Sequence, residues 1–449
     1  MKKFVTCTSL FIICNGLYIK QVSAQFTLSA QLRTRTELRD GQGSPLPKGA
    51  DPAFFTSQRT RLRVGYNMYR LKFGVALQDV RVWGQDASTI NRTTTADNNG
   101  LMLHEAWAEM LLTDTTLKNK ALSLKIGRQE LVYDDQRLIG SLDWQQQARR
   151  HDAVVVKYET KGWMLHLAAA FNQNKENNSG TIYNNTPAVN YTATTNGGAM
   201  YKSMQFLYAG RKLTNGNVSF LFFTDQFSKY HMDSVNYITV KTYEQGSWQR
   251  ATTGIYFNNT FNKLTTTASA YYQFGKTATS QKLSACLISG AVQYSFSKKV
   301  SAAAGIDYTS GGTNGATSKA FDPLYGTPHK FWGLMDYFYA ATPFGKNGLT
   351  DYYVKTRYTS SDKWWLAADF HQFGSAAKIT GLNKKSFGQE IDIVGNYSLT
   401  KQINIEGGYS HYFTTSLLTS PAVKNITNAQ KNNNWAYVMI NIKPDFLFK

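Results

Sequence analysis

The sequence of 449 residues has few cysteines, few prolines and little charge. It contains three cysteines and nine prolines, and charged residues make up 17% of the chain, against roughly 25% in ordinary soluble domains. Beyond residue 24 no segment approaches the ~18 consecutive apolar residues that a transmembrane helix requires. These shortages exclude a membrane protein built of α-helices.

Aromatic and small polar residues take the place of the missing charge. Tyr, Phe and Trp occur 27, 26 and 9 times, and such side chains fit the pleated surface of a sheet. The composition therefore favours a β-rich chain with a polar surface. Lys and Arg outnumber Asp and Glu by 49 to 29, which gives a formal net charge of +20.

The N-terminus has the pattern of a secretory signal peptide. A basic pair and an apolar stretch over residues 10–14 precede small residues that end at Ala24. We therefore expect a signal peptide over residues 1–24 and a single domain over residues 25–449. Cleavage removes three lysines and two cysteines, which leaves a net charge of +17 and Cys286 as the one remaining cysteine. An internal disulfide is then excluded.

The mature chain alternates between polar and apolar residues with a period of two, the pattern of half-buried strands. Arginine recurs at every second position over residues 33–39, with a Glu between, and again over residues 59–63. A tight turn is expected at residues 67–68. A third run over residues 71–77 loses its register near Asp79, where we expect either a bulge or a strand leaving the membrane.

The same alternation continues to the end of the chain, interrupted by short turns and long polar connections. Short turns are expected near residues 119, 161, 215, 262, 298, 361 and 400. Long connections are expected over residues 40–57, 84–100, 129–149, 173–200, 226–249, 276–281, 309–350, 375–385 and 414–432. Nine strands in each direction then give about 18.

This pattern predicts an all-β fold, a transmembrane antiparallel up-and-down β-barrel of about 18 strands with short periplasmic turns and long extracellular loops. After signal cleavage it would lie in the outer membrane of a Gram-negative type of cell, with both chain ends in the periplasm. A soluble β-sandwich or β-helix stays open as an alternative, because alternation alone does not distinguish these folds.

Alternation also assigns the two faces of the wall. The lipid-facing candidates are Trp163, Leu165, Leu167, Phe171, Val218, Phe220, Phe222, Trp364, Leu366, Phe370, Ile403, Ile405 and Tyr409. The lumen-facing basic candidates are Arg33, Arg35, Arg59, Arg61, Arg63, Lys125, Lys157, Lys355 and Arg357. The lumen-facing acidic candidates are Glu37, Glu105, Glu109, Asp369, Glu390 and Asp392.

A barrel of this size has room for an aqueous lumen, and a basic lining suits an anion channel. In that interpretation the guanidinium groups replace part of the hydration shell of a passing carboxylate or phosphate. Two plainer interpretations stay open. The arginines and acids could stiffen the wall through ion pairs, or the positive charge could lie in loops and turns that face anionic headgroups or surface polysaccharide.

Other chemistry has little support in the sequence. Seven histidines are scattered without metal-ligand spacing, and neither a phosphate-binding glycine loop nor a G-x-S-x-G elbow is present. We expect no enzyme activity, metal site or cofactor. The acids over residues 129–135 are expected to pair with Arg137, Arg149 or Arg150.

Several segments, taken in order, resemble the alginate export family of outer-membrane porins. They are residues 57–63 (SQRTRLR), 103–107 (LHEAW), 126–129 (IGRQ), 134–140 (DDQRLIG), 144–153 (WQQQARRHDA), 321–327 (FDPLYGT) and 329–333 (HKFWG). The resemblance implies an 18-stranded barrel with a constricted, electropositive lumen that exports an anionic uronate polymer. It implies pore arginines at Arg59, Arg61, Arg63, Arg128, Arg137, Arg149 and Arg150.

We therefore expect an outer-membrane channel for anionic solutes, with an alginate-like acidic polysaccharide as the leading substrate. The expected partners are outer-membrane lipid, anionic small molecules or acidic polysaccharide, the barrel-assembly machinery and periplasmic export components, and no nucleic acid. The loops 173–200 and 309–350 are candidates to gate the pore from outside. A general small-solute porin is the alternative, followed by an outer-membrane enzyme or a surface-binding barrel.

Overall fold

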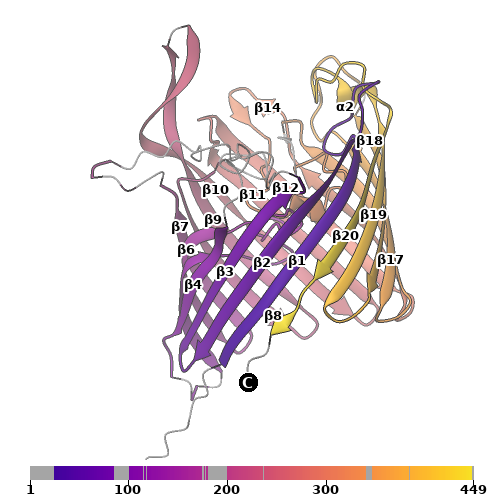
Figure 1. Ribbon diagram of the computed structural model, residues 1–449. Helices are drawn as coiled ribbons and strands as arrows, with labels where there is room; N and C mark the ends of the chain where they lie inside the picture. Colours follow the sequence, from indigo (N-terminus) through magenta and orange to yellow (C-terminus); the bar gives the residue numbers. More distant parts are fainter. Residues whose placement is uncertain are drawn as a thin grey trace, which may run out of the picture.

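The computed structural model shows one antiparallel sheet that closes on itself as a barrel (Figure 1). The structure describes residues 25–84, 101–114, 116–117, 119–173, 176, 178–180, 200–235, 237–339, 346–383 and 385–446. The barrel closes where the first long strand pairs with the last, from Leu32 opposite Ile442 to Asp40 opposite Asn434. The expected signal peptide lies outside the described residues.

In the part of the chain that the structure describes, eighteen long strands form the wall, as the alternation predicted. They are β1 (Gln25–Asp40), β2 (Ala53–Met68), β3 (Leu71–Val82), β4 (Met102–Leu111), β5 (Lys120–Gln129), β6 (His151–Thr160), β7 (Trp163–Phe171), β8 (Ser203–Leu213), β9 (Gly216–Val235), β10 (Ile238–Phe261), β11 (Leu264–Lys276), β12 (Lys282–Ser295), β13 (Val300–Thr309), β16 (Leu349–Thr359), β17 (Trp364–Gly374), β18 (Ser386–Ser398), β19 (Ile403–Thr414) and β20 (Asn432–Ile442).

The remaining elements are short. They are β14 (Thr313–Asn314), β15 (Thr317–Ser318), β21 (Asp445–Phe446), the 3-10 turn η1 (Pro328–Lys330) and the single helical turn α2 (Ser416–Thr419). Among the described residues, no helix has the length and apolar character to cross a membrane.

The two faces of the wall follow the predicted alternation. On β7, Leu165 and Leu167 are 43% and 53% exposed on the outer face, whereas Ala168 and Ala170 are 8% and 2% exposed on the inner face. A chain that places apolar side chains outward and buries its alternate positions matches a wall between lipid and a lumen. The soluble alternatives are therefore set aside.

Two local predictions on β2 and β3 need correction. The turn after β2 lies at residues 69–70 instead of 67–68, because Arg70 takes the positive φ of 61° that the turn requires. The register break occurs between Ala76 and Leu77, where β4 bulges. Beyond it, Asp79 pairs with Arg81 at 2.7 Å on the outer face of β3, so these charged residues interrupt the apolar pattern while β3 itself has no bulge.

The segment 226–249 was expected to be a loop and instead continues the sheet. β9 and β10 extend as a long hairpin above the rest of the barrel, at the upper left of Figure 1. Its pairing runs to Val235 opposite Ile238, with a bulge between Tyr243 and Ser247. Tyr, Thr, Val and Ile are frequent in this segment, and their preference for strands explains the extension.

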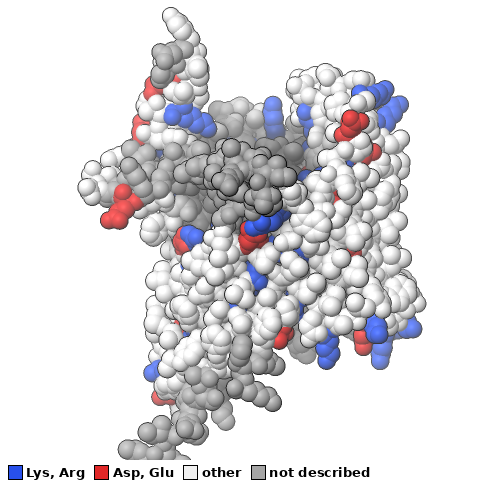
Figure 2. All heavy atoms as spheres, in the orientation of Figure 1, with Lys and Arg blue, Asp and Glu red and all other residues white. Residues whose placement is uncertain are grey.

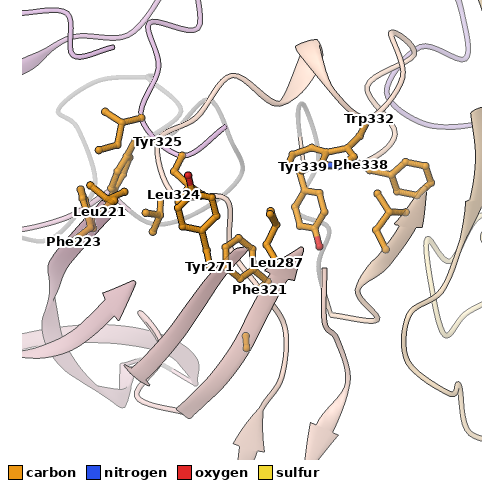
Figure 3. Close-up of a cluster of buried hydrophobic side chains, with 14 of the residues drawn as sticks. Leu221, Phe223, Tyr271, Leu287, Phe321, Leu324, Tyr325, Trp332, Phe338 and Tyr339 are labelled. Atoms are coloured by element: carbon orange, nitrogen blue, oxygen red, sulfur yellow. The ribbon is translucent and has the colours of Figure 1, made fainter. Parts of the chain in front are cut away.

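Two of the long connections turn into the barrel instead of staying outside it. The connection after β5, residues 130–150, and the described part of the connection after β13, residues 310–339 and 346–348, meet through a parallel bridge between Ile139 and Tyr325. Their backbones exchange further bonds, with the Gly140 N–H donating to the Tyr325 carbonyl at 2.9 Å. Figure 3 shows the buried cluster where Phe321, Leu324 and Tyr325 meet wall residues such as Leu221, Phe223 and Tyr271.

These two connections, here called the inner loops, correct the sequence-based expectation. Residues 129–149 and 309–350 were placed outside the membrane, and residues 309–350 were expected to act from there. Their buried apolar residues, among them Leu138, Ile139, Trp332 and Phe338, explain why they fold inward. Burial of apolar side chains away from water is favourable, and the inner wall has apolar side chains, such as Leu221 and Phe223, against which they pack.

Candidate functional site

The lumen arginines of β1 and β2 gather around one carboxylate of the first inner loop. Asp143 Oδ1 lies 2.8 Å from Arg59 Nη1 and 3.9 Å from Arg61 Nη1, and its Oδ2 lies 3.3 Å from Arg33 Nη1. The antiparallel register places Arg33 directly opposite Arg59. Alternation on two paired strands therefore brings the arginines together, and the first inner loop adds the carboxylate between them.

The same arginines bind the backbone of the inner loop. Arg33 donates to the carbonyl of Asp143 at 2.8 Å, and Arg35 donates to the carbonyl of Trp144 at 2.9 Å. The Arg35 guanidinium also lies over the Trp144 ring, 4.3 Å from its centroid, and pairs with Glu37 at 2.8 Å. Arg33 and Arg35 therefore hold the loop in place.

Arg63 differs from its neighbours because it remains open to solvent. Its side chain is 46% exposed, against 1% for Arg59 and 3% for Arg61. It borders a polar cavity of about 350 Å³, within the range of roughly 300–1,000 Å³ typical of small-ligand sites. The charged residues lining this cavity are Arg59, Arg61, Arg63, Lys443, Glu130, Asp143 and Asp445.

The predicted lumen carboxylates lie beside this cluster on β4. Glu105 is 3.6 Å from Arg63, and Glu109 is 3.0 Å from Lys157. Glu109 also accepts a hydrogen bond from Ser123 at 2.9 Å. Both acids face the lumen, and both are used in ion pairs along the wall.

Arg137, Arg149 and Arg150 lie on the first inner loop and not on the wall. Arg137 is 4% exposed and pairs with Asp307 of β13 at 2.6 Å and with Asp135 at 3.4 Å. Arg149 donates to the carbonyl of Gly326 on the second inner loop, and Arg150 directly precedes β6. The expected pairing of Asp135 with Arg137 is confirmed.

The expected pairing of the other acids in residues 129–135 is wrong. Glu130 pairs with Arg61 and Arg63 at 3.5 and 3.6 Å. Asp134 accepts hydrogen bonds from Tyr208 and Ser219 at 2.9 and 2.8 Å. Sequence distance favoured nearby arginines, whereas the inward turn of the loop brings distant wall residues closer.

Arg128 is the one predicted pore arginine that the structure places on the outer face. It shares an alternation class with Ile126, which is 45% exposed, and it lies opposite Asp152 on β6. The two side chains form a bidentate pair at 2.8 and 2.9 Å. The neighbouring residue, Gln129, is the one that is buried on the inner side. The pore position that the family resemblance implied for Arg128 is therefore wrong.

Arg357 lies on the inner face near the lower end of β16, away from the cluster. Its guanidinium stacks over Trp365, 3.9 Å from the ring centroid. Together with Lys355, which pairs with Asp369 at 3.0 Å, it adds positive charge to a part of the wall that four strands, β17 to β20, separate from β1.

Carboxylates of β13, β16 and β18 form a second cluster, of which the sequence had singled out only Glu390 and Asp392. Asp307, Asp351, Glu390 and Asp392 are each at most 2% exposed. Glu390 accepts a hydrogen bond from the Met335 N–H at 2.7 Å, and Asp392 accepts a weaker one from Leu334 at 3.4 Å. Asp351 is 2.8 Å from His371. Inner-loop backbone and ion pairs thus cover the acids.

Burial and neighbouring charges shift the pKa values of two carboxyl groups on the first inner loop. Burial alone would raise the pKa of Asp143, but Arg59 and Arg33 outweigh it and hold that pKa below its usual range. Burial raises the pKa of Asp134 to about 6, against the opposing effect of its bonds from Ser219 and Tyr208. Asp143 is thus fully ionised at neutral pH, whereas Asp134 titrates close to neutral pH.

The exposed surface has its own charge pattern. On the face shown in Figure 2, the wall has few charged side chains, and lysines and arginines gather at its lower rim. Exposed lysines occupy the short turns at Lys161, Lys263, Lys298, Lys363 and Lys401. Part of the positive charge therefore lies outside the lumen, as one of the alternatives held. Among the described residues, no group of three or more His, Cys, Asp or Glu is arranged to hold a metal ion.

Known structures share this architecture at low sequence identity. OccK5 (OpdH) of Pseudomonas aeruginosa is 10% identical, with a TM-score of 0.59 over 94% of this chain and 98% of that one. OccAB4 of Acinetobacter baumannii is 11% identical, with a TM-score of 0.59 over 95% and 99%. OpdK of Pseudomonas aeruginosa, in a structure with vanillate, is 9% identical, with a TM-score of 0.57 over 94% and 99%.

The sequence itself matches one family. No curated protein matches the chain significantly. The family model described as alginate export matches residues 24–418, which is most of the chain and includes both the arginine cluster and the two inner loops. An 18-stranded barrel of this kind is an outer-membrane channel, and the chain belongs to the alginate export family.

Proposed function

We propose that this channel prefers anions and that its substrate is an alginate-like acidic polysaccharide. The observation that carries the proposal is the cavity beside Arg63, whose lining has four cationic side chains against three carboxylates. A guanidinium group binds a carboxylate with two parallel hydrogen bonds, and such charge-assisted bonds are stronger than neutral ones. The family description, alginate export, names a polymer with one carboxylate on each sugar.

Arg63 is the residue through which the lumen would attract such a carboxylate. It is the exposed member of the arginine cluster, and its two acidic contacts, Glu105 and Glu130, are long at 3.6 Å. Long contacts to an exposed side chain are weak, so an incoming anion competes with them readily. Passage also requires binding that is weak enough for release.

A channel for small carboxylates is the second candidate. The two inner loops fill part of the lumen and bury a large aromatic cluster there, which suits single solutes better than a polymer. OpdK, which has a similar fold, has a structure with vanillate, a compound with a single carboxylate. We also propose that the barrel-assembly machinery inserts the chain and that periplasmic export components deliver a polymer to it.

The reversal potential of the purified, refolded protein in a planar bilayer under a KCl gradient tests the anion preference. We expect a potential on the chloride side, and concentration-dependent block of the current by mannuronate oligomers. Block by single glucuronate but not by the oligomers would favour the small-carboxylate channel. A potential near zero would contradict both candidates and leave the arginines as wall structure.

A matched pair of variants assigns the effect to the lumen. Arg63→Gln removes an exposed arginine beside the cavity, and Arg128→Gln removes a partly exposed arginine from the outer face. We expect Arg63→Gln to lower the chloride-to-potassium permeability ratio about twofold or more, since one of the four cations of the lining is lost. Arg128→Gln is expected to leave the ratio unchanged. Equal ratios in the two variants would remove Arg63 from the mechanism.

A further inference from the structure

The carboxylate of Asp143 occupies the place among the lumen arginines that a substrate carboxylate would take. Its two oxygens lie 2.8 Å from Arg59 and 3.3 Å from Arg33, which are the distances of charge-assisted hydrogen bonds and close ion pairs. A carboxylate on a sugar ring presents the same two oxygens in the same geometry. The first inner loop therefore supplies its own ligand to the arginine cluster.

Exposure shows which partner faces the cavity. The side chains of Arg33 and Arg59 are 4% and 1% exposed, whereas the side chain of Asp143 is 52% exposed. A solute in the cavity thus meets Arg63 and the Asp143 carboxylate first. It reaches the two buried guanidinium groups only when the Asp143 side chain rotates away.

The loop does not depend on this carboxylate for its position. The carbonyl of Asp143 accepts from Arg33 at 2.8 Å, the carbonyl of Trp144 accepts from Arg35 at 2.9 Å, and the Gln146 side chain accepts from Arg33 at 2.9 Å. These bonds keep the backbone in place while the side chain turns. Side-chain rotation is fast in exposed residues, so exchange of one carboxylate for another needs no loop opening.

We infer that Asp143 is an internal stand-in for the substrate carboxylate, displaced as an anion moves from Arg63 to Arg59 and Arg33 and restored as the anion leaves. This inference rests on the proposed function and describes how the affinity for the anion is regulated. By competing for the guanidinium groups, Asp143 weakens anion binding and shortens each stay. A channel needs such weakening, because an arginine cluster without a competing carboxylate would trap the anion.

Asp445 provides a matched control within the same cavity. It lines the cavity with Asp143, but it lies at the end of the chain, where β21 pairs with Ser29 of β1. Asp143→Asn and Asp445→Asn therefore remove the same negative charge from the same cavity. Of the two, Asp143 is the one whose carboxylate lies on Arg33 and Arg59.

The experiment measures current block by sodium glucuronate in planar bilayers for wild type, Asp143→Asn, Asp445→Asn and Asp143→Glu, with glucose as the neutral control. For Asp143→Asn we expect the half-blocking concentration to fall about tenfold, the scale of one charge-assisted hydrogen bond, and single block events to lengthen by a similar factor. Asp445→Asn is expected to change both less than twofold, and Asp143→Glu to stay near wild type. Heat-modifiable migration on gels checks that each barrel folds.

The outcomes separate this inference from the proposed function. A wild-type channel without anion preference overturns both. An anion-preferring wild type in which Asp143→Asn and Asp445→Asn block alike overturns the inference alone, because the lost charge then acts only through the general potential of the cavity. Tighter block in Asp143→Asn, together with wild-type block in Asp143→Glu, supports the inference.

Discussion

The two charged walls of the lumen hold the inner loops in opposite ways. The arginine wall, Arg33, Arg35, Arg59 and Arg61 on β1 and β2, binds carbonyls and the Asp143 carboxylate of the first inner loop. The carboxylate wall, Asp307 on β13 with Glu390 and Asp392 on β18, binds the Arg137 guanidinium and backbone N–H groups at residues 334–335. The arginine wall thus binds hydrogen-bond acceptors of the inner loops, and the carboxylate wall binds their donors.

The walls differ in what they leave open to solvent. The arginine wall borders a cavity, where the 46% exposed Arg63 lies next to it on β2, whereas Asp307, Glu390 and Asp392 are at most 2% exposed beneath the loops. A solute meets these covered carboxylates only through the loops, and Asp307 is also compensated by Arg137. The comparison teaches that the accessible charges, more than the number of charges, set the preference of such a lumen.

The largest expected effect comes from breaking the covered wall. In Arg137→Met the carboxylate of Asp307, which is 1% exposed, loses its ion pair at 2.6 Å, and an unpaired buried charge costs about 3–5 kcal/mol. In Arg33→Met the partner Asp143 is 52% exposed and keeps its contact with Arg59. The loop then loses only the neutral acceptors' bonds from Arg33, and we expect a loss of about 1–2 kcal/mol. Urea unfolding followed by tryptophan fluorescence measures both.

A double variant identifies the cause of that difference. Arg137→Met combined with Asp307→Asn leaves no buried charge, so we expect it to recover more than half of the loss of unfolding free energy. If the double variant is as unstable as Arg137→Met alone, the cost comes from lost packing against Phe331, whose ring lies 3.9 Å from the guanidinium.

A smaller effect is expected at the closest approach of the second inner loop to the carboxylate wall. Gly333 has a φ of 79°, and a Cβ there would lie 2.4 Å from Glu390 Oε2. Gly333→Ala therefore adds a clash to the strain of a positive φ, and we expect a loss of about 1–3 kcal/mol in unfolding free energy.

Gly381 is the matched control for that substitution. It has the same φ of 79°, but a Cβ there would meet no atom within 4 Å. Gly381→Ala is thus expected to show the strain of the positive φ alone, about 1 kcal/mol. Equal losses in the two variants would mean that Glu390 gives way and that the close approach is not a constraint.

The smallest expected effect is a pH dependence at Asp134, which anchors the first inner loop between the two walls. Its pKa of about 6 exceeds the ordinary carboxyl value because of burial, so the folded state binds the proton more tightly than the unfolded state. This contribution to stability is fully present below pH 4 and is lost as the pH rises through 6. The unfolding midpoint of wild type minus that of Asp134→Asn should therefore fall over this range. A constant difference would contradict the raised pKa.

Local patterns were enough to predict much of the wall. A period of two in segments such as 163–171 identified the strands and their outer faces, because each side chain of a strand points to the side opposite its neighbour. The same rule placed Arg33, Arg59 and Arg61 in the lumen. It failed for the hairpin of β9 and β10, because residues 226–249 were assigned to a long polar connection.

Family resemblance placed some individual side chains correctly and others incorrectly. It placed Arg59, Arg61 and Arg63 correctly on the inner face, where alternation agreed. It misplaced Arg128, which alternation assigns to the outer face together with Ile126. It also marked Arg137 and Arg149 as pore residues, whereas Arg137 is a covered ion-pair partner of Asp307.

The sequence by itself determined the barrel, its approximate strand number and, through alternation, the side of the wall on which the residues of the recognised strands lie, because these follow from spacing along one chain. Only the tertiary structure decided that two long connections turn inward, that Asp143 reaches Arg33 and Arg59 across more than eighty residues, and that the carboxylates of β13 and β18 are covered. The reason is physical. Burial and pairing depend on what distant segments offer each other in space, and the free energy of a charge in the lumen depends on those neighbours.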